Sequence, residues 1–140
     1  MTTSLDATLD DLMEQARRAA QNAYAPYSGF RVGAALRLAN GEIVTGTNVE
    51  NVSYGLTICA ERAAMCAAIA RFGPQARVTA VAVANLNGAA SPPCGACRQV
   101  LSEFAAPDVP VAFQTMTGTR AMRFADLLPL AFEMTLEKRS

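Results

Sequence analysis

Two short cysteine motifs, well separated along the chain, place the strongest constraint on its fold. They are Cys59-x-Glu61 and Pro93-Cys94-x-x-Cys97. Three thiols at these spacings can hold one Zn²⁺ and leave a fourth coordination position open. A catalytic zinc needs this open position because it admits water. Glu61 stands two residues from the first cysteine, close enough to contact that water without being a ligand itself.

A metal ligand, any residue and Glu, followed later by Pro-Cys-x-x-Cys, is the pattern of zinc-dependent nucleobase deaminases. Much of the chain around these motifs resembles the small zinc-dependent, homotetrameric cytidine deaminases. The similarity covers most of the chain outside its two ends, and it is carried by residues 24–35, 48–51, 59–62, 93–100 and 127–132.

The resemblance implies a nucleoside pocket beside the metal. It assigns the ribose, chiefly its 3′-hydroxyl, to hydrogen bonds with Asn48 and Glu50, whose side chains project to one side if the segment is extended. It places Phe30 against the base or sugar, and the backbone N–H of Ala60 against the pyrimidine. Phe30 and the Asn48-x-Glu50 pair narrow the expected substrate from the wider deaminase superfamily to free cytidine.

The resemblance also implies a homotetramer with sites shared between subunits. In that assembly Phe132 and Tyr54 reach a neighbour's site. The chain keeps the phenylalanine, but Glu133 and Met134 stand where a Gly-Pro type of continuation is usual in the family. Ordinary core packing is the alternative interpretation for both Phe132 and Phe30.

The charge balance bears on possible partners. The 140 residues contain 12 Lys and Arg and 12 Asp and Glu, so the formal net charge is zero. Proteins that follow a phosphate backbone usually have a basic excess, so a small, nearly uncharged substrate fits better than nucleic acid. No apolar run approaches the ~20 residues of a membrane helix, and residues 1–11 lack a signal core. We expect a cytosolic protein, in which four cysteines indicate metal or catalysis before disulfides.

The order of expected elements favours one α/β catalytic domain over residues 1–140. Helical periodicity predicts a first helix from residue 4 or 5 to 23, and Asn40-Gly41 predicts a hairpin. Other helices are expected at 60–72, from 94 or 95 to about 104, and at 126–130 with Asp126 as cap. Strands are expected at 30–38, 42–47, 78–84, 110–115 and 119–124. This order predicts a three-layer αβα sandwich with a five-stranded mixed sheet, the fold that the resemblance also implies.

We expect Arg62 to balance negative charge at the metal site. Three thiolates on Zn²⁺ leave a net negative charge, which makes the ion a poorer acid for its water. Both cysteine motifs fall where helices begin, and the positive helix ends offset part of this charge. We expect Arg62 to offset more by hydrogen bonding to the sulfurs, because the third Cys stands where relatives have a neutral His. For Arg98, pairing with a surface carboxylate and support of the Cys94–Cys97 turn both stay open.

The expected reaction is hydrolysis of cytidine and 2′-deoxycytidine to uridine and 2′-deoxyuridine with release of ammonia, as in pyrimidine salvage. Zinc lowers the pKa of a bound water toward ~7. Glu61 would carry one proton from that water to ring N3 and a second proton to the leaving amine. One carboxylate suffices if it lies within hydrogen-bond reach of both the water and N3.

The same residues admit other interpretations. A structural zinc would need Cys66 as fourth ligand, but Cys66 lies about 10 Å beyond Cys59 along one expected helix. A redox pair would leave Glu61 without a role. For Glu61 itself the alternative is a solvated first-turn residue stabilised by the helix dipole. For Asn48 and Glu50 the alternative is turn polarity after a strand.

Three other functions share the zinc motifs. A deaminase of a modified cytosine nucleoside, such as a nucleoside antibiotic, need not keep Phe30 and the Asn48-x-Glu50 pair. A polynucleotide deaminase would need a basic stripe interleaved with aromatic residues. A non-enzymatic zinc module would have no use for Glu61 beside an open coordination position. The sequence does not rank ribose against deoxyribose.

Overall fold

The structure is a computed structural model that describes residues 2–3 and 7–133. Its elements follow one another along the chain in an order close to the expected one. They are β1 (Thr2–Thr3), α1 (Ala7–Ala20), β2 (Val32–Leu38), β3 (Ile43–Thr47), the 3₁₀ helix η1 (Tyr54–Leu56), α2 (Ala60–Phe72), β4 (Val78–Asn85), α3 (Gly95–Ser102), β5 (Pro110–Thr115), β6 (Gly118–Arg123) and α4 (Phe124–Leu127).

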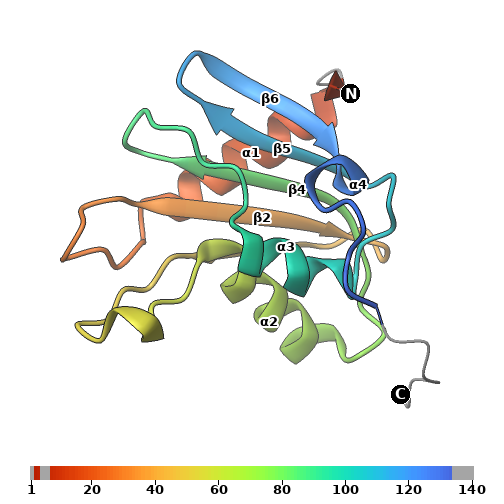
Figure 1. The fold of residues 1–140 in the computed structure, drawn as a ribbon, viewed down its shortest axis with the longest axis horizontal. Coiled ribbons are helices and arrows are strands. Elements are labelled where there is room, and N and C mark those ends of the chain that lie inside the picture. The colour runs from red at the N-terminus through yellow and green to blue at the C-terminus, as the bar shows by residue number, and fades with distance from the viewer. Residues whose placement is uncertain (1, 4–6, 134–140) are drawn as a thin grey trace.

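The strands form one mixed sheet in the order β1-β6-β5-β4-β2-β3 (Figure 1). β4 and β5 pair in parallel, and all other neighbours pair antiparallel. The five predicted strands are all present, and the two-residue β1 adds a short edge beside β6. The predicted mixed sheet is therefore confirmed.

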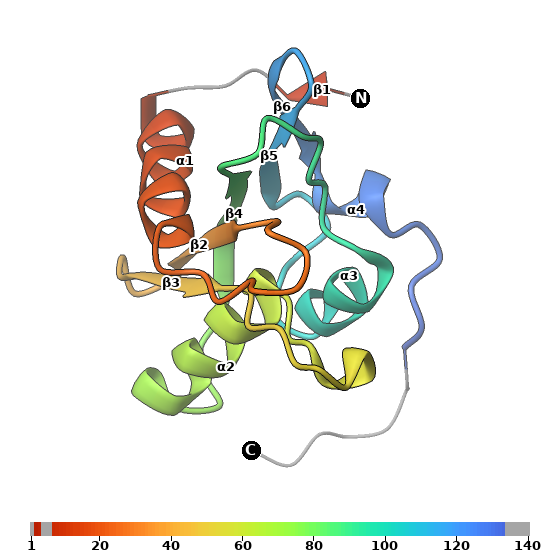
Figure 2. The ribbon, with the colours of Figure 1, turned by 90° about the vertical axis from the view of Figure 1, so that its left-hand side faces the viewer.

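Helices cover both faces of this sheet, which confirms the predicted three layers. α1 packs on one face, against β2 and β4, while α2 and α3 lie on the other face (Figure 2). The sequence of β4 explains the division, because alternate residues of a strand point to opposite faces. Ala80, Ala82 and Ala84 join the core beneath α1, whereas Val81 and Val83 join the core beneath α2 and α3.

Two glycines allow the long helices to approach the sheet closely. Gly33 in β2 lies beneath α1, where a Cβ atom would collide with the backbone of Ala16. Gly46 in β3 lies beneath α2, where a Cβ atom would stand 2.5 Å from the Ala64 nitrogen and 2.7 Å from the Ala60 oxygen. Because backbone cannot yield as a flexible side chain does, Gly46 sets the distance at which α2 begins over the sheet.

The bounds of α2 are the predicted ones. Gly73 follows the helix with φ 86°, a conformation that favours glycine, and its N–H donates to the Ile69 carbonyl at 2.8 Å. Pro74 comes next and cannot continue the helix. At the other end, Cys59 directly precedes the first helical residue.

Other helix boundaries differ from the predictions. α1 ends at Ala20, three residues early, and its predicted start at residue 4 or 5 lies outside the described residues. The Asp126 cap is wrong, because α4 begins at Phe124 with Arg123 in the N-cap position. Phe124 is buried and draws the helix start upstream, and Asp126 pairs instead with Arg123 at 3.2 Å.

The Asn40-Gly41 hairpin is present, and its connection spans residues 39–42. Gly41 has φ 89° and donates its N–H to the Leu38 carbonyl at 2.9 Å. Within the described ranges, no helix has the length and apolar character needed to cross a bilayer.

Candidate active site

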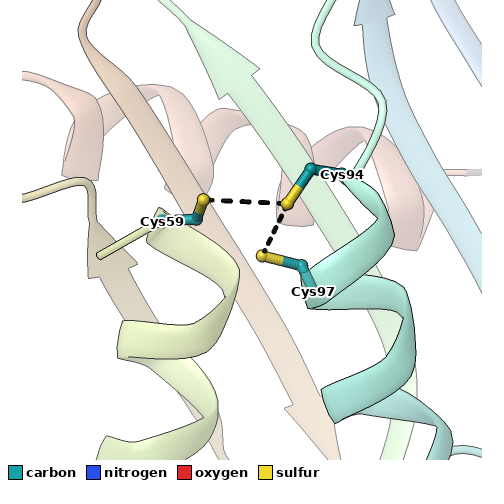
Figure 3. A group of neighbouring side chains, drawn as sticks. All are labelled: Cys59, Cys94 and Cys97. Atoms are coloured by element: carbon teal, nitrogen blue, oxygen red, sulfur yellow. Dashed lines mark hydrogen bonds between the residues drawn. The ribbon is translucent and has the colours of Figure 1, made fainter. Parts of the chain in front are cut away.

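Three cysteine side chains meet at the starts of two neighbouring helices (Figure 3). Cys59 stands at the N-cap position of α2, and Cys94 stands at the N-cap position of α3, with Cys97 in the first turn. Neither N-cap thiol bonds to its own helix end, so both side chains are free to turn toward each other. The Sγ atoms of Cys59 and Cys94 are 3.8 Å apart, and those of Cys94 and Cys97 are 3.5 Å apart.

This group of sulfurs fits a zinc ion. All three Sγ atoms lie within 4.8 Å of one another, and a tetrahedral zinc with Zn–S bonds of ~2.3 Å separates its sulfurs by about 3.8 Å. Within the described part of the chain, the group includes no fourth His, Cys, Asp or Glu. Cys66 lies outside it as an exposed free thiol. The donor set therefore matches a zinc site with one position left open.

The environment of the sulfurs favours a charged thiolate even without a metal. A hydrogen bond with Cys97, supported by Arg62 and Cys94, lowers the pKa of Cys59 to about 5. The same hydrogen bond and burial raise the pKa of Cys97. The metal-free protein thus holds a Cys59 thiolate beside a protonated Cys97, and binding of a divalent cation would release the Cys97 proton.

Arg62 faces the sulfurs from the first turn of α2, as expected. Its terminal nitrogen donates to Cys59 Sγ at 3.6 Å, and this bond raises the pKa of the guanidinium. Its Nε is buried and has no hydrogen-bond partner among the described residues. The side chain is thereby placed to balance negative charge on the sulfurs.

Arg98 links the second cysteine motif to the end of α4 by hydrogen bonds. Its Nε donates to the Pro93 carbonyl at 2.7 Å, and its Nη1 donates to the Leu127 carbonyl at 2.8 Å. Of the two roles left open by the sequence, support of the Cys94–Cys97 turn is the one that the contacts favour.

Glu61 is buried beside the sulfurs, with 4% of its surface exposed. Burial raises the pKa of its carboxyl from 4.5 to about 7, against the lowering effect of its own backbone N–H. A carboxyl of this kind can take up and release a proton near neutral pH, as a general acid-base residue must. The solvated first-turn alternative for Glu61 is therefore excluded.

Glu61 lines a cavity of about 470 Å³, which is the size of a small-molecule binding site. Eight of the predicted site residues line it: Phe30, Asn48, Glu50, Tyr54, Cys59, Ala60, Glu61 and Cys94. Tyr54 stands at the rim, 77% exposed. Phe132 is 71% exposed and is not among the lining residues, so its predicted contact would need a second chain.

Asn48 pairs with the backbone at the start of β2. Its Oδ1 accepts from the Val32 N–H at 3.0 Å, and its Nδ2 donates to the Phe30 carbonyl at 2.8 Å. A side-chain amide offers two donor hydrogens and two acceptor lone pairs. One of each therefore remains for a molecule in the cavity.

Glu50 is held by the loop before β2. Its Oε1 accepts from the backbone N–H groups of Tyr27 and Ser28 at 3.0 and 3.1 Å, and its Oε2 accepts from the Ser28 hydroxyl. The bond from the hydroxyl is the main cause of a lowered pKa, so the Glu50 carboxylate is ionised. Oε2 retains a lone pair that can accept a hydrogen bond from a hydroxyl group of a ligand.

The sequence did not reveal three polar residues that line the same cavity, namely Ser28, Thr57 and Ser91. Ser28 bonds to a carboxylate 22 residues away. No local pattern indicates such a pair, because both residues lie in loops without periodicity.

The fold and the three-thiol group with its buried carboxylate define a class, the zinc-dependent deaminases. Residues 6–113 match the family described as the cytidine and deoxycytidylate deaminase zinc-binding region, and the chain belongs to this family. The cytidine deaminase of Mycobacterium tuberculosis is 45% identical over 127 residues, 91% of each chain. That of Halalkalibacterium halodurans is 43% identical over 122 residues, 86% of this chain and 91% of the relative.

Solved structures agree with this assignment. The crystal structure of the Mycobacterium tuberculosis cytidine deaminase has a TM-score of 0.80 at 43% identity, covering 92% of this chain and 100% of that one. A blasticidin-S deaminase from Bacillus cereus is more distant, 31% identical over 108 residues, which is 72% of this chain and 76% of the relative.

Replacing one sulfur should abolish zinc binding. We expect Cys94→Ser to purify without zinc, because two thiols and a hydroxyl hold the ion far more weakly than three thiols. Cys66→Ser, a matched change at an exposed thiol outside the group, should retain one zinc per chain. Atomic absorption after gel filtration measures this ratio. Full zinc in Cys94→Ser, or loss of zinc in Cys66→Ser, would contradict the three-ligand assignment.

Proposed function

We propose that the chain is a zinc-dependent cytidine deaminase that hydrolyses cytidine and 2′-deoxycytidine to uridine and 2′-deoxyuridine and releases ammonia. The observation that carries the proposal is Glu61, a buried carboxyl in the same cavity as Cys59 and Cys94. Its relatives supply the substrate class, since those at 43–45% identity are cytidine deaminases. We further propose that residues 1–140 act as one catalytic domain in the cytosol, in pyrimidine salvage.

The chemistry divides between the metal and the carboxyl. Cys59, Cys94 and Cys97 would hold one zinc ion per chain, and bound zinc supplies a Lewis acid that brings the pKa of a water toward ~7. Glu61 takes a proton from the attacking water and gives it to ring N3 while the C4–O bond forms. It then carries the second proton to the departing amine. A pKa near neutrality suits both directions of transfer.

The sugar side of the cavity suits a nucleoside. Asn48, Glu50 and Phe30 all line the cavity. The second amide hydrogen of Asn48 and the remaining lone pair of Glu50 would together complement a hydroxyl that both donates and accepts. We assign them to the ribose 3′-hydroxyl, Phe30 to the base or sugar, and the Ala60 N–H to the pyrimidine.

A deaminase of a nucleoside antibiotic is the alternative from the same class. The blasticidin-S deaminase shares 31% identity with the chain, against 45% for the cytidine deaminase of Mycobacterium tuberculosis. The greater similarity and its fuller coverage favour cytidine. Parallel assays with cytidine and blasticidin S separate the two substrates directly.

Removing the charge of Glu61 should stop catalysis while leaving binding intact. We expect Glu61→Gln to retain zinc and bind cytidine but to lose about 10²–10⁴-fold in kcat, the usual contribution of a general acid-base group. The loss of ultraviolet absorbance as cytidine becomes uridine measures turnover. Glu42→Gln, in the exposed β2–β3 connection, is the control and should be fully active. Substantial turnover by Glu61→Gln would remove this residue from the mechanism.

Removing the charge of Arg62 should weaken catalysis through the sulfurs. We expect Arg62→Gln to keep its zinc but to lose roughly tenfold or more in kcat, a typical cost for a group that supports metal ligands. Arg71→Gln, at the far end of the same helix where the guanidinium lies over the Phe72 ring, should leave kcat unchanged. Unaltered turnover by a fully zinc-loaded Arg62→Gln enzyme would contradict the role.

We also propose that the chain assembles as a homotetramer with shared sites. The segment 49–58 exposes an unusual run of apolar side chains close to the cavity: Val49, Val52, Tyr54, Leu56 and Ile58. Exposed apolar side chains concentrated in one short segment suit an interface. A second copy would cover it and would bring its own exposed Phe132 toward the rim at Tyr54.

The tetramer predicts that Phe132 acts on a neighbour's site. Light scattering should give the mass of four chains, and Phe132→Ala should raise the KM for cytidine severalfold while the assembly persists. Met116→Ala, an equally exposed apolar change at the β5–β6 turn, is the control and should leave KM unaltered. A fully active monomer would contradict both the assembly and the shared site.

A further inference from the structure

The backbone on both sides of Phe30 pairs with the side chain of Asn87. Asn87 Nδ2 donates to the Gly29 carbonyl at 3.0 Å, and the Arg31 N–H donates to Asn87 Oδ1 at 3.0 Å. One amide side chain thus supplies the donor and the acceptor that a neighbouring strand would supply. The Leu86 N–H continues this edge by donating to the Arg31 carbonyl at 3.0 Å.

The other edge of the same short segment pairs with Asn48, through the Phe30 carbonyl and the Val32 N–H. The Phe30 N–H donates to the Ser28 hydroxyl at 3.0 Å. The backbone around Phe30 is therefore held from both edges, although β2 itself begins only at Val32. The ring of Phe30 lines the cavity from this segment.

Asn85 fixes the turn that carries Asn87. Asn85 is 3% exposed, and its Oδ1 accepts from the N–H groups of Asn87 at 2.9 Å and Ala89 at 3.2 Å. Its Nδ2 donates to the Ala89 carbonyl at 2.8 Å and to the Ser91 hydroxyl at 3.0 Å. Ser91 lines the cavity, so one turn after β4 connects two walls of the site.

We propose that Asn87 is a positioning residue for the nucleoside. It lies outside both cysteine motifs, it is exposed, and it is not among the residues that line the cavity. Its effect on the substrate therefore passes through Phe30, whose backbone it holds. This inference rests on the proposed contact between Phe30 and the nucleoside, and it adds a residue that sets the tightness of that contact.

The test is a double-mutant cycle between Asn87 and Phe30 in the zinc-loaded enzyme. We expect Asn87→Ala to raise the KM for cytidine roughly three- to tenfold, the scale of one or two hydrogen bonds, with kcat and zinc content nearly unchanged. Phe30→Ala should raise KM by more. The double variant should match Phe30→Ala alone, because Asn87 has nothing left to position.

Asn40→Ala is the matched control. Asn40 is also an exposed turn amide, and its Oδ1 accepts from the Glu42 N–H at 2.9 Å in the β2–β3 connection. It should lower the thermal midpoint about as much as Asn87→Ala does, yet leave KM unchanged. An equal rise of KM in both asparagine variants would show that the change in KM comes from lower protein stability in general, and it would overturn the proposal.

Two other outcomes separate the inference from the function beneath it. If Phe30→Ala raises KM and Asn87→Ala leaves it unaltered, the inference fails while the proposed nucleoside contact stands. If Phe30→Ala leaves KM unaltered, the proposed contact fails, and the inference fails with it. Additive effects in the double variant would show that Asn87 acts by another route and would also overturn the proposal.

Discussion

The site depends on two helices, α2 and α3, that begin at the same end of the sheet, beside the carboxyl ends of its strands β3 and β4. β3 and β4 both pair antiparallel with β2, so they run in the same direction. An α-helix on the same face comes after each of them in sequence, α2 after β3 and η1, and α3 after β4. The two helix N-termini must therefore emerge together at the carboxyl ends of these strands. That meeting brings Cys59 and Cys94 to 3.8 Å, and positive helix ends favour the negative charge that the sulfurs carry there.

The same close packing buries Glu61, which is costly for an unpaired carboxylate. The cost appears as a pKa of about 7 rather than 4.5. In the metal-free protein this shift destabilises the folded state as pH rises through that interval, because the folded carboxyl holds its proton longer than the unfolded one. A fold selected for stability alone would place a neutral residue here. The proposed proton transfer would explain why a carboxyl stands here, and the charges of Arg62 and Cys59 act on it together with a hydrogen bond to Cys97.

The sequence predicted the parts of this protein that local chemistry determines. The end of α2 follows from the Gly73-Pro74 stop, and the strand β4 follows from its run of small apolar residues. The clustering of Cys59, Cys94 and Cys97 was predictable because their spacing is the pattern of a zinc site. The pairing of Glu50 with Ser28 was not, since it joins two loops 22 residues apart. The Asp126 cap failed for a related reason, because burial of Phe124, a tertiary effect, outweighed the local preference for Asp at a helix start.

The part of the cavity lined by Phe30 lies where the pairing of β2 ends. Buried backbone N–H and C=O groups at the end of a sheet still need hydrogen-bond partners. Pairing of β2 with β4 reaches Val32 and Asn85, and pairing with β3 begins one residue later at Gly33. Among the described residues, the segment just before Val32 has no strand paired on either side. Asn48 follows β3 and Asn87 follows β4, and their side-chain amides replace the missing strands. The backbone groups on both sides of Phe30 are therefore paired as they would be in a strand, and Phe30 still lines the cavity.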